Sequence, residues 1–329
     1  MDLSSFNNKK ILITGGNGYI AYNLIKALGN NELTVARLDS RIDKWPGIEK
    51  NGKIIFQNIE ADIRKRDVLE SVLPGFDIIY HFAAQTSSNI ADSDPVNDAG
   101  INLIPLINIL DICEKKNLKA VIIFSGTATE IGLNKQLVVS EIEEDLPVTI
   151  YDLNKLLAET YLNYYCRKGI VRGATLRLAN VYGPGPLGSN KDRGIVNMMV
   201  KRSINNTPLT LYGEGEYIRD YIFIDDVIYA FLLAAQNIDK INGEHFYIGS
   251  GKGHSIAELF NIISERTFVR TGYRPEIRHE ALPDNSSAIE KRNFISNIRK
   301  FVSSTGWEPT IDLQEGIDLT IEYFLNQTI

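Results

Sequence analysis

The sequence of 329 residues contains few of the side chains that bind metals or form cross-links. It has only two cysteines, Cys113 and Cys166, and four histidines, and none of them has the spacing of zinc ligands. Two cysteines cannot form the disulfide framework of a small secreted protein, so we expect a reducing, cytoplasmic location. The composition therefore predicts neither a metal site nor a disulfide scaffold.

The sequence also lacks an excess of positive charge and a long hydrophobic run. Lys and Arg number 35 against 41 Asp and Glu, a net charge of −6, whereas proteins that bind nucleic acids or anionic membranes usually carry a basic surface. The first residues, MDLSSFNNKK, have no apolar core, and apolar runs such as IIYHFAA are only as long as strands. We therefore expect a globular protein with no nucleic-acid partner, no signal peptide and no membrane span.

Short apolar runs alternate with amphipathic segments over the first half of the chain. Strands are predicted at 10–13, 33–38, 54–57, 77–82, 120–124 and 173–178, and helices at 18–29, 103–115 and 152–168. Such alternation is typical of right-handed crossovers in a parallel sheet with helices on both faces. The predicted fold class is therefore α/β, with a doubly wound parallel sheet.

A glycine-rich turn follows the first predicted strand and opens the first helix. Gly15 and Gly18 in TGGNGYIA allow a tight turn and a close approach of the backbone to a pyrophosphate, which the helix N-terminus would hold. Asp39 ends the second strand, where a carboxylate binds both adenosine ribose hydroxyls and repels a 2′-phosphate. The pattern predicts a Rossmann domain that binds NAD rather than NADP, although Arg37 and Arg41 flank Asp39 and either could weaken this preference.

The alternation weakens at the loop Gly183–Pro186, after which turns rich in glycine and asparagine become common. The predicted NAD-binding Rossmann domain comprises 1–182 and a segment at about 221–248 that returns to it. A smaller C-terminal α/β domain, made of 183–220 and 249–329, is predicted to bind the substrate.

Three residues form a candidate catalytic group. Tyr151 and Lys155 in YDLNK are one helical turn apart, on one face of a predicted helix. An ammonium group close to a phenol lowers the phenol pKa from about 10 and makes it a general base for an alcohol proton. Thr127 follows the fifth strand, at the edge where parallel sheets carry their chemistry, and its hydroxyl can bond the reacting oxygen. His81, at the end of the fourth strand, is expected to be structural.

Together these motifs resemble the extended short-chain dehydrogenase/reductase family, in its branch of nucleotide-sugar epimerases and dehydratases that includes UDP-glucose 4-epimerase-like enzymes. The resemblance covers nearly the whole chain and rests on TGGNGYIA, HFAAQ, FSGTAT, YDLNK, LRLANVYGPG and RDYIFIDDV. It implies that Tyr151 takes the proton of a sugar hydroxyl, usually at C4, while hydride leaves for NAD⁺. It also implies a homodimer through a four-helix interface and a role in making polysaccharide precursors.

The resemblance assigns further residues to the cofactor. Lys155 would hold the nicotinamide ribose, and Asp62 and Ile63 would lie near the adenine. The other cofactor contacts that it implies are Tyr19, Ile20, Ala83, Ala84, Gln85, Asn102 and Ser125.

The resemblance also implies a nucleotide-diphosphate sugar as the substrate. Asn180 would meet its diphosphate, Arg219 the diphosphate or nucleoside, and Arg292 would be a second phosphate-binding arginine. Guanidinium groups suit phosphates because each can bind in a bidentate manner. Asn197 and Tyr212 would contact the nucleoside base.

The segment after Thr127 separates the reactions of this family. The 4,6-dehydratases carry an acid there, whereas this chain has Ala128 and Thr129, with Glu130 one position late. This favours an NAD-dependent epimerase that acts at C4 through a transient 4-keto sugar. The same trio would serve a C4 dehydrogenase or 4-keto reductase, which is the main alternative. A C2 epimerase, a 4,6-dehydratase and a non-catalytic NAD-binding sensor are less favoured.

Three positions depart from the family pattern. Glu130-Ile131-Gly132 stands where Val-Tyr-Gly is common, and Asn154 replaces the serine of Tyr-x-x-Ser-Lys. Ile104-Pro105 replaces a Gly-Thr pair and should bend or restart its helix. These departures suggest a sugar other than the glucose and galactose pair.

Overall fold

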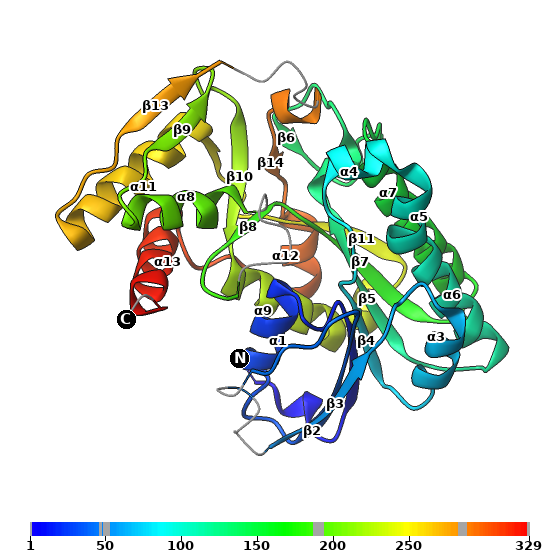
Figure 1. Cartoon of the computed structure of the whole chain (residues 1–329). Coiled ribbons are helices and arrows are strands. Elements are labelled where there is room, and N and C mark those ends of the chain that lie inside the picture. The colour runs from blue at the N-terminus through cyan, green and yellow to red at the C-terminus, as the bar shows by residue number, and fades with distance from the viewer. Residues whose placement is uncertain (1, 46–47, 49–52, 187–193, 282–287, 328–329) are drawn as a thin grey trace.

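The computed structural model describes residues 2–45, 48, 53–186, 194–281 and 288–327 (Figure 1). Its centre is a seven-stranded sheet in the order β11-β7-β5-β4-β1-β2-β3, and every neighbouring pair in it is parallel. The strands are β1 (Lys10–Thr14), β2 (Leu33–Asp39), β3 (Ile54–Glu60), β4 (Ile78–His81), β5 (Val121–Thr127), β7 (Arg172–Leu178) and β11 (Glu244–Ile248). The predicted α/β class with a doubly wound parallel sheet is confirmed.

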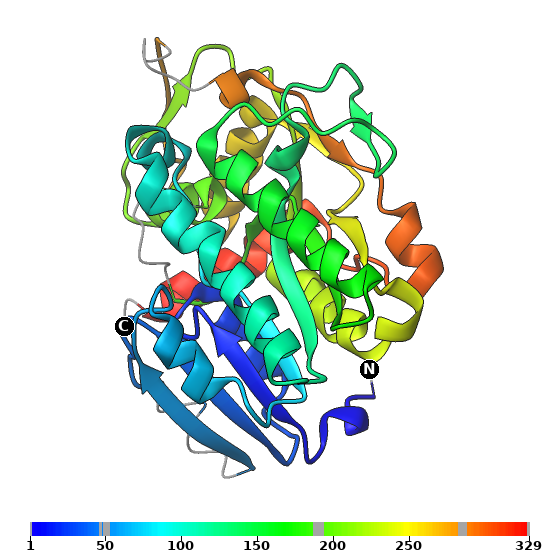
Figure 2. The same ribbon diagram turned by 90° about the vertical axis from the view of Figure 1, so that its right-hand side faces the viewer.

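The two faces of the sheet are buried in separate hydrophobic clusters because side chains alternate along a strand. Ile11 and Ile13 of β1 belong to one cluster and Leu12 to the other. Helices α1 (Tyr19–Ala27) and α9 (Ile224–Gln236) contribute to the first cluster, and α3 (Arg66–Val72), α6 (Ile104–Lys115) and α7 (Ile150–Arg167) to the second. Figure 2 shows α6 and α7 side by side over the sheet.

The helix that contains Pro105 restarts, as predicted. Helix α5 (Pro95–Asn102) ends before Leu103, and α6 begins at Ile104 with the proline in its first turn, where no hydrogen bond is lost. The two helices form a 21-residue stretch that is apolar enough to cross a membrane by length and composition. The sequence analysis expected apolar runs only as long as strands and did not predict this stretch. Leu106, Ile109 and Leu110 pack in the core beside the sheet, which accounts for this apolarity.

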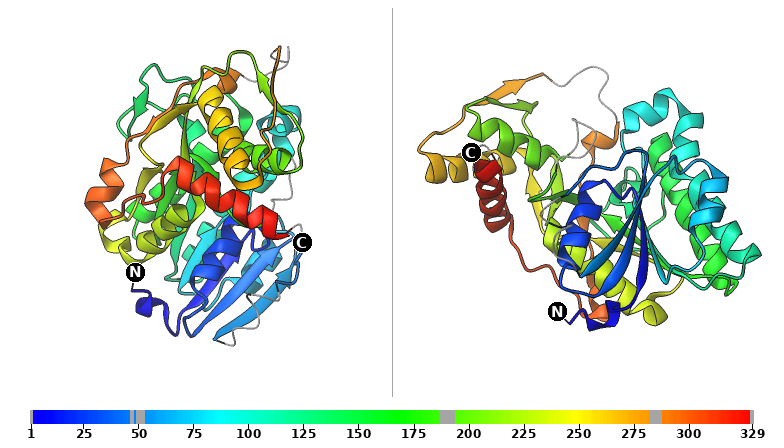
Figure 3. Two further views of the ribbon diagram at one scale, coloured as in Figure 1. Left: turned by 90° about the vertical axis from the view of Figure 1, so that its left-hand side faces the viewer. Right: turned by 60° about the horizontal axis from the view of Figure 1, so that its bottom comes forward.

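The rest of the chain forms small sheets and helices beyond the central sheet (Figure 3). The three small sheets join β8 (Asn180–Tyr182), β10 (Ile218–Phe223) and β12 (Gly253–Ser255); β9 (Leu209–Tyr212) and β13 (Ile277–Glu280); and β6 (Val138–Val139) and β14 (Ile295–Ser296). The remaining helices are α4 (Ser88–Ser93), α8 (Ile195–Ile204), α10 (Ile238–Ile241), α11 (Ile256–Thr271), α12 (Arg299–Thr305) and α13 (Leu313–Gln327), with short 3₁₀ turns η1 (Ser4–Phe6), η2 (Ala128–Ile131) and η3 (Ala288–Lys291).

The segment predicted to return to the Rossmann domain divides between two sheets. Helix α9 packs in the core of the large sheet and β11 is its edge strand. Tyr221 to Phe223 instead pair with β8 in the three-stranded sheet, because β8 follows β7 after one residue and brings its own partner strand with it. The domain boundaries themselves stay a prediction.

Candidate active site

Three of the sequence motifs meet at the carboxyl ends of neighbouring strands. Thr14 of β1 pairs with His81 of β4, and His81 pairs with Phe124 of β5. The glycine turn, the HFAAQ segment and Thr127 therefore leave the sheet at the same edge, where open parallel sheets bind ligands. Asp39, the last residue of β2, lies next to the turn.

The turn between β1 and α1 requires glycine. Gly15 has φ +67°, and a Cβ there would lie 2.7 Å from the backbone nitrogen of Ala83. Gly18 caps α1 without a side-chain hydrogen bond, and the first turn of the helix carries no acid. Backbone N–H groups at this helix N-terminus thus suit the pyrophosphate of NAD.

Asp39 and Arg37 both support the turn. The Asp39 carboxylate accepts a hydrogen bond from the backbone N–H of Asn17 at 3.0 Å. Arg37 is fully buried; its Nε donates to the oxygen of Gly16 at 3.0 Å, and its guanidinium lies 3.6 Å from the ring centroid of Trp45. These contacts hold the Arg37 guanidinium beside the turn, and its effect on the preference for NAD stays a prediction.

The residues predicted around the adenine and nicotinamide lie along this edge. Asp62 forms an ion pair with Arg64 at 2.6 Å. The hydrogen bonds that Arg64 donates to this carboxylate lower the pKa of Asp62. The Ser125 hydroxyl donates to the oxygen of His81 at 3.3 Å, and the N–H of Ala83 donates to the Thr14 hydroxyl at 3.3 Å. The side chains of Ile20, Ile63 and Ala84 are partly buried, and these residues follow β1, β3 and β4 in the sequence. Their contacts with a cofactor stay predictions.

Sequence reasoning missed a buried acid that joins the segment after β4 to helices α5 and α7. Asp98 of α5 accepts hydrogen bonds from the amides of Gln85 at 2.9 Å, Asn102 at 2.8 Å and Asn154 at 2.8 Å. Asn154, which replaces the usual serine, therefore ties α7 to α5. Asn102 also donates to the backbone oxygen of Gln85 at 2.8 Å, so the segment after β4 is fixed by side chains.

His81 is structural, as expected. It is fully buried, and its Nδ1 lies 2.7 Å from the Thr14 hydroxyl. Burial, with a contribution from the Lys155 charge, lowers the pKa of His81 to about 3. The ring is therefore neutral at ordinary pH and joins β1 to β4.

The three residues predicted to be catalytic come from β5 and the first turns of α7. Tyr151 is partly exposed, and Lys155 is only 2% exposed with its Nζ 4.1 Å from the ring centroid of Phe124. Thr127 is the last residue of β5 and is partly exposed. Thr149 caps α7 by accepting a hydrogen bond from the N–H of Asp152 at 3.2 Å. The structure thus places all three predicted residues at the edge that carries the glycine turn.

Glu130 stands one position after the place where the 4,6-dehydratases carry their acid, and its side chain points away from this edge. It is fully buried, and its carboxylate accepts the N–H of Thr127 at 2.7 Å and lies 3.1 Å from Arg177. Arg177 also pairs with Asp145 at 2.6 Å and with Glu159 at 2.7 Å. Burial, together with the nearby Glu159, raises the pKa of Glu130 above its usual value of 4.5. The only sequence signal of this cluster was a charged residue within the apolar strand TLRL.

Two buried arginines lie close to each other and to α7. Arg219 donates to the backbone oxygens of Glu290 at 2.7 Å, Ile218 at 3.1 Å and Arg292. Arg292 donates to the backbone oxygen of Ile289 at 2.9 Å, while its buried Nε has no hydrogen-bond partner among the described residues. Burial, and then the charge of Arg219, lower the pKa of Arg292 to about 10. Buried donors of this kind suit an anionic ligand.

The other predicted substrate residues have different surroundings. Asn180 donates to the backbone oxygen of Asp220 at 2.9 Å. Both amide atoms of Asn197 bond Gly183, at 3.0 and 2.9 Å, and the Tyr19 hydroxyl donates to the oxygen of Gly183 at 2.9 Å. Tyr212 ends β9 and is 48% exposed. The proposed contacts of these residues with ligands stay predictions, and 187–193, within the predicted substrate domain, are outside the described residues.

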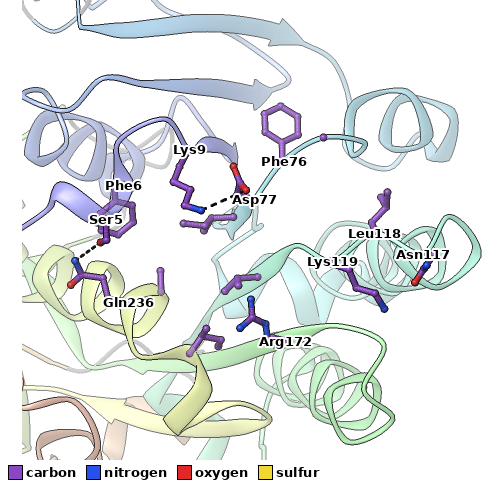
Figure 4. Close-up of a pocket in the computed structure, with 15 residues that line it drawn as sticks. Ser5, Phe6, Lys9, Phe76, Asp77, Asn117, Leu118, Lys119, Arg172 and Gln236 are labelled. Carbon is purple, nitrogen blue, oxygen red and sulfur yellow. Dashed lines mark hydrogen bonds and ion pairs between the residues drawn. The ribbon is translucent and has the colours of Figure 1, made fainter.

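A cavity of about 560 Å³ lies at the opposite edge of the sheet (Figure 4). Its lining includes residues at the amino ends of the strands, among them Asp77, Val121 and Arg172. Lys9 lies 3.8 Å from Asp77 within it. The cavity is therefore separate from the candidate active site. Among residues that the structure describes, no group of His, Cys, Asp or Glu side chains is arranged to hold a metal ion.

Comparison with known proteins places these features in a family. The sequence profile of the NAD-dependent epimerase/dehydratase family matches residues 11–249. The UDP-glucose 4-epimerase of Mycolicibacterium smegmatis is 29% identical over 97% of this chain and 99% of its own length. Two solved structures share the fold over nearly their full length. These are the UDP-glucose 4-epimerase of Thermotoga maritima with UDP-glucose (30% identity, TM-score 0.85, 97% of this chain and 100% of that chain) and the enzyme of Thermus thermophilus with NAD (27% identity, TM-score 0.81, 96% and 99%).

Proposed function

This chain belongs to the NAD-dependent epimerase/dehydratase family, and from that premise we propose that it epimerises a nucleotide sugar at C4, with UDP-sugars as the first candidates. The observation that carries the proposal is the trio Thr127, Tyr151 and Lys155 beside a glycine turn, with no acid at positions 128 or 129. An epimerase needs one base and one hydride acceptor, whereas elimination of water needs a further acid at the sugar.

The burial of Glu130 supports epimerisation over dehydration. Its carboxylate is bonded to the N–H of Thr127 and faces Arg177, so it is turned into the core below the site. A side chain in that position cannot reach a sugar bound on the other side of β5.

The buried arginines support a diphosphate-containing substrate. Arg219 and Arg292 repel each other, and the nearest acid to Arg219 is the exposed Glu290 at 3.9 Å. A diphosphate would neutralise both guanidinium groups and accept a hydrogen bond from the unpartnered Nε of Arg292. Relatives with UDP-glucose in their names and structures favour UDP as the nucleotide.

The roles of the residues in the reaction follow from their chemistry. Tyr151 takes the proton of the C4 hydroxyl, and Lys155 stabilises the resulting charge and the ribose beside it. NAD⁺, held by the glycine turn, Asp39 and Lys155, would supply the hydride acceptor for oxidation at C4. Thr127 contacts the reacting oxygen, and the sugar must turn over before the hydride returns to its other face.

The first experiment is to denature the purified protein and quantify the nicotinamide that it releases. We expect near-stoichiometric NAD⁺ or NADH, because an epimerase that loses its reduced cofactor strands the keto sugar. UDP-glucose, UDP-galactose and their N-acetylated forms are then followed by NMR for epimer formation. Release of NADH without epimerisation of any sugar would instead favour the C4 dehydrogenase or 4-keto reductase.

A single substitution tests the assignment of the base. Tyr151→Phe removes the phenol that moves the proton and should lower the epimerisation rate by about 10²- to 10⁴-fold while NAD remains bound. Tyr164→Phe is the matched control, since Tyr164 is 47% exposed on the same helix, and it should keep its rate. An unchanged rate in Tyr151→Phe would contradict the mechanism and favour a non-catalytic sensor.

We also place a second copy of this chain on the outer face of α5–α7. Leu153, Leu157 and Tyr161 of α7 and Val96 of α5 are all more than a third exposed, and large apolar side chains exposed on neighbouring helices are typical of an interaction site. This supports the homodimer through four helices that the resemblance implied. The buried, unpaired cysteines fit a reducing cytoplasm, where the enzyme would supply polysaccharide precursors.

A further inference from the structure

Glu130 and Thr127 are joined by a reciprocal set of hydrogen bonds at the end of β5. Thr127 is the N-cap of η2, and its Oγ1 accepts the backbone N–H of Thr129 at 3.3 Å. In return, the backbone N–H of Thr127 donates to the carboxylate of Glu130 at 2.7 Å. This arrangement is a capping box, which fixes how the chain enters a helix. The position of the Thr127 hydroxyl is therefore set through its side chain and its backbone together.

Glu130 is enclosed on the side of β5 that faces the core. Its side chain is fully buried, and a Cβ at Gly126 would lie only 2.9 Å from one of its carboxylate oxygens. The absence of a side chain at Gly126 thus leaves the room that the carboxylate fills beneath the strand. A larger residue at this position would push the carboxylate away from the N–H of Thr127.

The guanidinium of Arg177 lies beside Glu130 but is hydrogen-bonded to other acids. The Arg177 Nε is 3.1 Å from the second carboxylate oxygen of Glu130, while its N–H donates to Glu159 at 3.0 Å. That second oxygen has no hydrogen-bond partner among the described residues. Asp145 and Glu159 pair with the guanidinium at 2.6 and 2.7 Å. The capping box therefore uses one oxygen of Glu130 as an acceptor, and Arg177 remains paired without Glu130.

We propose that Glu130 is a positioning residue of the reaction, which acts through the backbone N–H of Thr127. The inference rests on the proposed function, in which the Thr127 hydroxyl contacts the reacting oxygen at C4. Glu130 is buried on the core side of β5, so its loss should leave the binding of the sugar nucleotide and of NAD unchanged. A displaced hydroxyl slows the chemical step, because rates fall steeply when a contacting group moves by about 1 Å. Loss of the acceptor should therefore lower kcat and leave KM unchanged.

Substitution by methionine removes the acceptor but keeps the length of the side chain. Glu130→Met should lower kcat about 5- to 50-fold for the UDP-sugar on which the wild type is fastest, among UDP-glucose, UDP-galactose and their N-acetylated forms. KM and the amount of bound NAD should stay within about twofold of the wild type. Glu130→Gln restores an acceptor, and its amide nitrogen replaces the oxygen that has no partner among the described residues. Its kcat should match that of the wild type.

Asp145→Asn is the matched control for the charge cluster. Asp145 pairs with the same guanidinium, whereas the N–H of Thr127 donates to Glu130. Asp145→Asn should lower the free energy of unfolding but leave kcat unchanged at temperatures well below unfolding. A loss of kcat in Asp145→Asn or in Glu130→Gln as large as that in Glu130→Met would overturn the inference.

A double-mutant cycle tests whether Glu130 acts through the Thr127 hydroxyl. In a Thr127→Val background, Glu130→Met should cause no further loss of kcat, because the group that it positions is absent. A further loss, or a wild-type kcat in Glu130→Met alone, would overturn the inference and leave the proposed function standing. A wild-type enzyme that binds NAD but epimerises none of these UDP-sugars would overturn the proposed function and this inference with it.

Glu130→Asp provides a second variant in case Glu130→Met does not fold. It keeps the charge beside Arg177 but shortens the side chain by one methylene, which withdraws the carboxylate from the N–H of Thr127. The kcat should fall in the same direction as in Glu130→Met, with KM unchanged. A Glu130→Asp enzyme with the wild-type kcat would contradict the inference.

Discussion

Asp39 and Arg37 lie two residues apart on β2 and have different surroundings. Arg37 is buried against the glycine turn and Trp45, while Arg41 is exposed and paired with Asp43 at 2.8 Å. Neither arginine is placed like the carboxylate at the strand end. At the scale of single residues, the preference for NAD over NADP should therefore depend on Asp39.

Asp39→Ala should weaken NADH binding by about 10- to 100-fold, because hydrogen bonds to a charged group are lost. NADPH binding should weaken less, since repulsion of the 2′-phosphate disappears as well. Fluorescence titration with both reduced cofactors measures the ratio of the NADH affinity to the NADPH affinity. Arg41→Ala is the control and should leave it unchanged, whereas a larger effect at Arg41 would assign the preference to the arginine.

At the scale of elements, the turn between β1 and α1 depends on close packing against the segment after β4. Gly15 and Gly75 both have positive φ, +67° and +91°, but a Cβ at Gly15 meets backbone at 2.7 Å, whereas one at Gly75 meets nothing within 4 Å. Gly75→Ala should cost about 1–2 kcal/mol of strain. Gly15→Ala should lower the free energy of unfolding by about 1–3 kcal/mol more than Gly75→Ala does. Added NAD should no longer stabilise the Gly15→Ala protein. Thermal unfolding with and without NAD measures both, and equal losses would contradict the close approach.

The charge cluster around Arg177 joins η2, α7 and β7, and it should make stability depend on pH. Burial raises the pKa of Glu130 above 4.5, so the folded state keeps a proton there that the unfolded state has lost. Stability then falls as pH rises above 4.5 through the raised pKa. Burial, with a contribution from the Arg177 charge, lowers the pKa of His245 to about 3, which gives the opposite slope below its usual 6.5.

Glu130→Gln should flatten the fall in stability between pH 7 and 9, a range in which His245 is neutral in both states. The amide can still accept the N–H of Thr127 but no longer titrates. Urea unfolding of the variant and the wild type at several pH values gives the slopes. The same slope in both proteins would show that another group keeps the proton.

At the scale of the whole molecule, the apolar outer face of α7 should hold two chains together. Leu157 on this face is 37% exposed, and Leu319 on α13 is 38% exposed, so the two leucines form a matched pair. Leu157→Glu would place a charge in the proposed interface and should halve the mass measured by light scattering. Leu319→Glu should leave the mass unchanged. A wild-type mass of one chain would refute the dimer.

The sequence by itself determined the elements and the main motifs, because their signals are local. Alternating apolar runs predicted the strands of the central sheet, Pro105 predicted the restart of a helix, and the spacing of Tyr151 and Lys155 placed both on one helix face. The glycine turn could be recognised without knowledge of distant residues, because its glycines stand between a predicted strand and a predicted helix.

Only the tertiary structure decided which buried polar groups pair with one another. Asp98 meets Asn154 across 56 residues, Arg177 meets Asp145 across 32, and Asp152 reaches Thr129 across 23. Such pairings leave no periodicity in the sequence, because they depend on which elements the sheet order brings together. The same holds for Tyr221 to Phe223, whose strand looked like part of the large sheet but pairs with β8. Local patterns fix the elements, whereas the desolvation of charges inside the packed fold fixes their partners.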